Sequence, residues 1–153
     1  MTATAPQAFH GSFTINREYD AAPARVFKAF ADMKSKARWF AGPWKELQRD
    51  MDFRVGGQEV VHGLWPDGRE TKFTARYHEI IPNARIVYVY DMHINGEHMS
   101  VSLATLEFTP KGSGKTAIKF TEQAVYVDGK DGNESRREGT TWLLDQVAAN
   151  LPD

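Results

Sequence analysis

Apolar and polar residues alternate along most of this chain of 153 residues, as they do in strands with one buried face. The segment FHGSFTINREY, residues 9–19, alternates in this way and predicts a first strand. From residue 44 to residue 127 every segment alternates, and the junctions hold turn-forming residues: Gly56-Gly57, Asp67-Gly68, Pro82-Asn83, Asn95-Gly96 and Gly112–Gly114. This stretch therefore predicts six antiparallel strands joined by hairpins.

Three segments have helical periodicity instead. Pro23 suits the first turn of a helix, and the apolar residues that follow it in PARVFKAFAD recur at helical spacing. KSKARWF predicts a second short helix that ends before Gly42-Pro43. SRREGTTWLLDQVAANL predicts a long C-terminal helix with one face formed by Thr140, Leu143, Leu144, Val147 and Leu151. The predicted order is one strand, two short helices, six strands and one long helix, which is an α+β fold.

The lengths of the turns predict which side chains share a face of the sheet, because pairing parity decides the facing of every residue. Two-residue turns at Gly56-Gly57 and Asp67-Gly68, followed by a turn at Pro82-Asn83, place one set of side chains on the inner face: Met51, Phe53, His62, Phe73, Ala75, Tyr77, Tyr88, Tyr90 and Met92.

At Asn95-Gly96 a two-residue turn would point Glu107 inward, so we favour a three-residue turn with Gly96 in the left-handed conformation. This choice continues the inner face with His98, Ser100, Ser102, Ala104, Leu106 and Phe108, and then with Ile118, Phe120 and Glu122. The resulting face mixes small residues with bulky aromatic ones. Closed by one long helix, such a face predicts a ligand cavity rather than a solid core.

Composition excludes several classes of function. A net charge of −1 leaves no electrostatic footprint for nucleic acid, and the absence of cysteine removes disulfides, thiol catalysis and thiolate metal sites. The N-terminus lacks the features of a signal peptide, and no apolar run is long enough to span a bilayer, so we expect a cytoplasmic protein. We expect residues 1–8 to form a flexible tail and residues 9–153 a single domain.

The string GSGKT, residues 112–116, resembles the end of a nucleotide-binding phosphate loop. Such a loop needs a glycine five positions before Gly114, where this chain has Thr109, and it needs a helix after the Lys-Thr pair. The segment TAIKFTEQAVYV that follows alternates and predicts a strand. The glycines therefore indicate a hairpin turn.

The order of elements and several segments resemble the START-like, or SRPBCC, superfamily with the Bet v 1-like helix-grip fold. The branch that they resemble is that of the homologues of the activator of Hsp90 ATPase, and the segments are REYDAAPARVFKAFAD, ARWFAG, MDFRVGGQE, YHEIIPNARIVYVYD, TAIKFTEQ and GTTWLLDQVAANL. The last helix of this branch commonly opens with Gly-Trp, whereas here Gly139 is followed by Thr140. The resemblance implies a curved seven-stranded antiparallel sheet wrapped around the C-terminal helix, with a hydrophobic cavity between them. It also implies a wide choice of functions, from lipid carriers to cyclases and co-chaperones, so function has to be argued from the site.

Glu122 is the most informative candidate, because a carboxylate inside an apolar cavity would have a raised pKa and could serve as an acid, a base or a ligand anchor. The alternatives are a bulge that turns it outward or a pair with an arginine such as Arg17 or Arg49. His62 and His98 are candidates for ligand contact, with a satisfied core residue as the alternative for each. His93 and His98 flank one turn but are predicted to face opposite sides, so we expect no metal site there, and we expect no cofactor.

The predicted function is the binding or carriage of a small hydrophobic or aromatic molecule. The predicted cavity residues are Trp39, Phe40, Phe53, His62, Phe73, Tyr77, Tyr88, Tyr90, Met92, His98, Phe120, Glu122 and Leu143. One alternative is a cyclase or hydrolase in which Glu122 and a histidine act as an acid/base pair. The other is a chaperone-interaction module. The exposed edges of the sheet could also allow a homodimer.

Overall fold

A computed structural model of the chain describes residues 4–153 and has the predicted order of elements. Its strands and helices are β1 (Phe9–Tyr19), α1 (Pro23–Ala31), α2 (Met33–Ala37), β2 (Lys45–Met51), β3 (Gln58–Leu64), β4 (Glu70–Ile81), β5 (Arg85–Ile94), β6 (Glu97–Lys111), β7 (Lys115–Tyr126) and α3 (Asn133–Ala149). The predicted tail begins with residues 1–3, which lie outside the described residues, and residues 4–8 have no regular structure.

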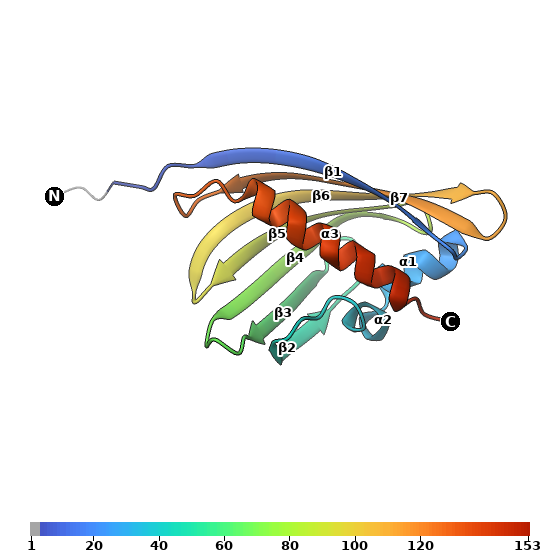
Figure 1. Cartoon of the computed structure of the whole chain (residues 1–153), viewed down its shortest axis with the longest axis horizontal. Coiled ribbons are helices and arrows are strands. Elements are labelled where there is room, and N and C mark those ends of the chain that lie inside the picture. Colours follow the sequence, from blue (N-terminus) through green and yellow to red (C-terminus); the bar gives the residue numbers. More distant parts are fainter. Residues whose placement is uncertain (1–3) are drawn as a thin grey trace.

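The strands form one seven-stranded antiparallel sheet in the order β1-β7-β6-β5-β4-β3-β2. Figure 1 shows that this sheet curves around α3, while α1 and α2 lie near the C-terminal end of α3. This arrangement confirms the predicted α+β helix-grip architecture. No helix among the described residues is long and apolar enough to cross a membrane.

The well-packed part of the core lies where α1 and the C-terminal half of α3 meet the sheet. Phe27 of α1 packs edge-on against Phe108 at a centroid distance of 5.3 Å. On α3 only Leu144 and Val147 are buried, and the Tyr19 hydroxyl donates a 2.7 Å hydrogen bond to the Leu144 carbonyl. The C-terminal half of α3 is therefore held firmly against the sheet.

The inner face is as predicted on β4 and β5 but is inverted on β3. Residues 52–57 form a longer connection than the predicted two-residue turn, so Met51 pairs with Glu59. The next connection spans residues 65–69, so Leu64 pairs with Glu70. Each of these two differences shifts the pairing by an odd number of residues, which exchanges the inner and outer faces of the strand that follows. The first exchange turns β3 over, and the second restores the predicted facing on β4.

The inversion of β3 corrects the prediction for His62. Its side chain lies on the outer face, where its Nε2 atom is 3.4 Å from a carboxylate oxygen of Glu70. In its place Glu59 and Val61 face the inside and are buried. The change of register places the Glu59 carboxylate in the core. The alternation of residues along β3 gives no sign of it.

The prediction for His98 is also wrong, although the facing of the rest of β6 is right. The Asn95-Gly96 turn has two residues, with φ angles of 52° and 78°, and a bulge after Met92 restores the parity that the predicted three-residue turn would have supplied. His98 precedes the bulge and therefore lies outside, with its ring stacked on His93 at 4.7 Å and its Nε2 atom 2.8 Å from Asp91. His93 and His98 thus share a face, contrary to prediction.

The GSGKT string forms the tight turn between β6 and β7, as predicted. Lys111 pairs with Lys115 across the turn, and Gly112 and Gly114 have φ angles of 58° and 72°. Glycine adopts these angles without steric cost. The strand that follows carries Ile118, Phe120 and Glu122 on the inner face, all of them buried.

Candidate functional site

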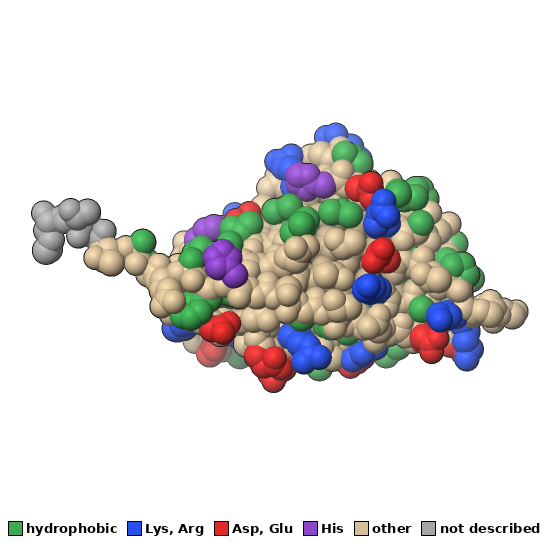
Figure 2. All heavy atoms as spheres, turned by 90° about the horizontal axis from the view of Figure 1, so that it is seen from above, with side chains coloured by type: hydrophobic (Ala, Val, Ile, Leu, Met, Phe, Trp, Pro, Cys, Tyr) green, Lys and Arg blue, Asp and Glu red, His purple; other side chains and the backbone are tan. Residues whose placement is uncertain are grey.

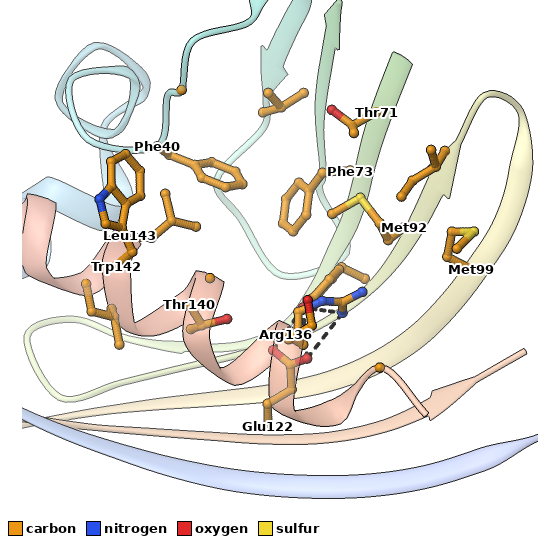
Figure 3. A pocket seen from close by; sticks show the side chains of 18 of the residues that line it. Phe40, Thr71, Phe73, Met92, Met99, Glu122, Arg136, Thr140, Trp142 and Leu143 are labelled. Carbon is orange, nitrogen blue, oxygen red and sulfur yellow. Dashed lines mark hydrogen bonds and ion pairs between the residues drawn. The ribbon is translucent and has the colours of Figure 1, made fainter. Parts of the chain in front are cut away.

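A cavity of about 690 Å³ lies between the inner face of the sheet and the N-terminal half of α3. Figure 3 shows its helical wall, from which Arg136, Thr140 and Leu143 project, and its opposite wall, which includes Phe73 and Met92. The volume is within the range of roughly 300–1,000 Å³ that is typical of small-molecule sites.

The helical wall of the cavity is formed partly by small residues. Gly139 and Thr140 of α3 line it, and a larger side chain at either position would fill part of the space. Ser100, Ser102 and Ala104 of β6 face the inside as predicted, but they are fully buried and are not among the lining residues. Ser100 and Ser102 instead accept hydrogen bonds from the guanidinium of Arg136.

Ten of the thirteen predicted site residues line this cavity: Trp39, Phe40, Phe73, Tyr77, Tyr88, Tyr90, Met92, Phe120, Glu122 and Leu143. The other three lie elsewhere. Phe53 follows β2 and fills the closed end of the core, with its ring centroid 5.9 Å from Phe27 and 4.9 Å from Tyr77. His62 and His98 lie on the outer face of the sheet for the reasons of register given above.

Glu122 faces the inside and accepts hydrogen bonds from three side chains. The Tyr90 hydroxyl lies 2.9 Å from both of its oxygens, and the Ser102 hydroxyl lies 2.9 Å from Oε2. The third donor is Arg136 of α3, whose Nη1 atom is 3.4 Å from Oε2. Neither predicted arginine is the partner, since Arg17 pairs with Asp145 and Arg49 with Glu46.

The guanidinium of Arg136 ties the first turn of α3 to three strands. Besides Glu122 it donates to Tyr90 at 2.9 Å, to Ser102 at 3.3 Å and to Ser100 at 2.8 Å. A signal for this residue existed in the sequence. Arg136 precedes Thr140 by four residues and Leu143 by seven, so it extends the predicted inner face of the helix by one turn.

Burial and neighbouring charges shift the pKa values of Glu122, Arg136 and Tyr90. Burial raises the pKa of Glu122, while Arg136, Tyr90 and Ser102 oppose the rise by stabilising the ionised carboxylate. Burial would lower the pKa of Arg136, but Tyr90 and Glu122 outweigh this effect and raise it. Burial and the Glu122 charge raise the pKa of Tyr90, which therefore remains a hydrogen-bond donor. We infer that Glu122 is held as an anchor for α3.

A second buried ion pair lies on the other side of the cavity. Lys36 of α2 and Glu59 of β3 are joined at 2.7 Å, with side chains only 8% and 2% exposed. The Tyr77 hydroxyl donates to the same Glu59 oxygen at 2.6 Å. The ammonium of Lys36 also lies 5.1–6.0 Å from four aromatic ring centres, those of Phe40, Phe73, Tyr88 and Trp39.

Neither member of this pair was among the predicted site residues. The predicted pairing of β3 put His62 on the inner face, and Glu59, an odd number of positions away, therefore fell on the outer face. Lys36 stands three residues before Trp39 and four before Phe40, so helical spacing was a signal that it lies on their side.

The entrance side of the cavity carries further aromatic residues. Trp44 and Trp65 lie against one another at 5.0 Å, and the guanidinium of Arg69 lies 4.5 Å from the Trp65 ring centre. Trp142 of α3 is about half exposed at the rim. Gly63 lies beneath Trp44, where a Cβ atom would approach the indole to 2.4 Å, so only glycine leaves room for the indole there.

The lining offers no acid/base pair of the kind considered from sequence. His62 and His98 lie on the outer face, so the sheet separates them from Glu122, and neither is among the lining residues. Figure 2 shows histidine side chains at the surface of the molecule. Within residues 4–153, no group of three or more histidine, aspartate or glutamate side chains could hold a metal ion. The cavity can enclose an apolar molecule, and the polar groups of its lining can orient that molecule.

Comparison with known proteins agrees with this geometry. A putative uncharacterized protein from Rhizobium leguminosarum is 38% identical to the chain, with a TM-score of 0.89 over 95% of this chain and 97% of that one. A protein from Rhizobium loti is 41% identical, also with a TM-score of 0.89, over 95% and 99% of the two chains. A protein from Chromobacterium violaceum is 27% identical, with a TM-score of 0.76 over 93% and 98%.

No curated protein matches the chain. A family model described as "Activator of Hsp90 ATPase homolog 1-like protein" matches residues 20–151. That range contains both buried ion pairs and all of the residues that line the cavity. The chain therefore belongs to the Activator of Hsp90 ATPase homolog 1-like family, within the START-like superfamily that its motifs indicated.

Proposed function

We propose that this protein binds or carries a small hydrophobic or aromatic molecule in the cavity between the sheet and α3. The observation that carries the proposal is a cavity of about 690 Å³ whose lining is rich in aromatic side chains. An apolar molecule that left water for this space would be stabilised by about 25 cal/mol for each Å² of apolar surface that it buried.

The two buried ion pairs support a binding role over a catalytic one. Each carboxylate is already bonded to a cation and to a tyrosine, so neither is free to exchange protons with a substrate. Chaperone binding, which the name of the family suggests, would use the exterior and would leave the aromatic cavity unexplained.

The proposal is tested by titrating the protein with Nile Red, an uncharged dye whose fluorescence rises in apolar surroundings. We expect saturable binding with one site per chain. Thr140→Phe would place a ring inside the cavity and should weaken binding about tenfold or more. Glu138→Phe adds the same ring at an exposed position of α3 outside the cavity and should leave the affinity unchanged.

The proposal fails if the dye does not bind saturably, or if both variants bind it as the original chain does. Circular dichroism and thermal unfolding of each variant would establish that α3 is still folded. A loss of binding that Glu138→Phe shares would indicate a surface site instead of the cavity.

A further inference from the structure

We propose that the ligand is an uncharged aromatic molecule with a carbonyl oxygen, and that the hydroxyl of Tyr88 donates a hydrogen bond to that oxygen. This inference rests on the proposed function, since it names the class of molecule that the same cavity takes. It is carried by the balance of charge around the cavity and by one hydroxyl that has no partner in the protein.

The charges around the cavity cancel. Inside, Lys36 is paired with Glu59 and Arg136 with Glu122. At the rim lie Arg69, Lys130, Asp128 and Asp131, all of them partly or fully exposed. Four cations thus face four anions. A ligand with a net charge would bring a buried charge with no partner, which costs several kcal/mol, so the balance favours an uncharged molecule.

Three tyrosines form a row across the floor of the cavity, and only the middle one is unpaired. Tyr88 lies between Tyr77 and Tyr90, with ring centroids 6.1 Å and 6.0 Å apart. Tyr77 donates to Glu59 and Tyr90 to Glu122, so both outer hydroxyls are satisfied. The side-chain hydrogen bonds among the described residues include those of Tyr77 and Tyr90 but none of the Tyr88 hydroxyl.

The hydroxyl of Tyr88 is open to the cavity. In the part of the chain that the structure describes, the side-chain polar atoms that are both inaccessible and unpaired are Arg69 Nε and His93 Nδ1. The Tyr88 hydroxyl is not one of them, and the space that its side chain borders is the cavity. Burial raises the pKa of Tyr88 well above its usual value, so the group stays a neutral O–H donor.

The groups around the Tyr88 hydroxyl favour a ligand that carries a hydrogen-bond acceptor. The ammonium of Lys36 lies 5.9 Å from the Tyr88 ring centre and makes one hydrogen bond, to Glu59, while its other N–H groups face aromatic rings. Donors therefore exceed acceptors at this end of the cavity. A carbonyl oxygen supplies an acceptor without adding charge, which an amine or a carboxylate does not.

Three naphthalene probes of matched shape test the inference: 2-acetylnaphthalene with a ketone, 2-ethylnaphthalene without oxygen, and 2-naphthoate with a negative charge. Their affinities would be measured by calorimetry and by displacement of Nile Red. We expect the ketone to bind more tightly than the carboxylate. In Tyr88→Phe, the affinity of the ketone relative to the hydrocarbon should fall about three- to tenfold, as expected for one neutral hydrogen bond.

Tyr19→Phe is the matched control, because it also removes a buried tyrosine hydroxyl, one that donates to the Leu144 carbonyl and does not itself belong to the cavity lining. It should leave the ratio of ketone to hydrocarbon affinity unchanged. Should Tyr88→Phe fail to fold, the ketone and carboxylate affinities of the original chain still decide whether the ligand is uncharged.

The outcomes separate the two proposals. If the probes bind but Tyr88→Phe leaves the ratio of ketone to hydrocarbon affinity unchanged, the role of Tyr88 is overturned. The cavity would then remain a binding site. Tighter binding of 2-naphthoate would overturn the uncharged ligand and point to Lys36 as an anion partner. If none of the three probes binds, the proposed function fails, and this inference fails with it.

Discussion

Replacing Arg136 by methionine should destabilise the fold, because it leaves the Glu122 carboxylate buried without its cation. The two side chains are 17% and 1% exposed, so the pair is largely shielded from water. Removing one partner of a buried pair costs roughly 3–5 kcal/mol. Tyr90 and Ser102 still donate to the carboxylate, so we expect the lower end of this range, about 3 kcal/mol.

The loss should depend on pH in a definite direction. Burial already raises the pKa of Glu122 and Arg136 lowers it, so the variant should have a still higher pKa in the folded state. A carboxyl whose pKa is higher when folded than when unfolded favours the folded state at low pH, where it is protonated, and disfavours it at high pH. The destabilisation should therefore be greatest above the folded pKa and should shrink as the pH falls towards the unfolded value.

The assay is unfolding by urea, followed by circular dichroism at several pH values. Arg137→Met is the matched control, because Arg137 is exposed and lies 3.7 Å from Glu134; it should change the free energy of unfolding by less than about 0.5 kcal/mol. Adding Glu122→Gln to Arg136→Met should recover part of the loss by removing the buried charge. The reasoning would be refuted by equal losses in the two arginine variants, or by a loss that does not change with pH.

Three further predictions concern the cavity and its neighbours. Gly63→Ala should displace the Trp44 indole, which a Cβ atom would approach to 2.4 Å, so that tryptophan fluorescence changes and the free energy of unfolding falls by about 1–3 kcal/mol. Lys36→Met should cost roughly 3–5 kcal/mol in urea unfolding, because Glu59 stays buried with no cation. His62→Ala should leave the affinity for Nile Red unchanged in a titration, because the side chain lies on the outer face of the sheet.

Each of these has a result that would contradict it. Unaltered fluorescence in Gly63→Ala would mean that the indole does not lie over the glycine. Lys34→Met, an exposed change in the same helix, serves as the control for Lys36→Met. A similar loss of unfolding free energy in both variants would mean that Lys36 and Glu59 do not form a buried ion pair. Weaker dye binding in His62→Ala would restore the original prediction for the facing of β3.

The sequence by itself determined the order of the elements, the places where the chain turns (though not the length of each turn) and the facing of β4 and β5. Phe73, Tyr77 and Tyr90 are buried on the inner face as the alternation predicted, and the glycines at 112 and 114 form a turn. These features depend on residues next to each other in the chain. Period-two alternation and turn-forming residues act over a few positions, so they can be read without knowing what lies opposite.

The contents of the candidate site were decided by the tertiary structure. Glu59 faces inward because the connections on either side of β3 are longer than their Gly-Gly and Asp-Gly pairs suggested, and facing depends on loop length to within one residue. Arg136, rather than Arg17 or Arg49, reaches Glu122 because α3 crosses the inner face of the sheet with its first turn above the cluster of Tyr90, Ser102 and Glu122. Buried charges take whichever partner the fold brings within a few ångströms, so the choice of partner depends on how distant segments meet.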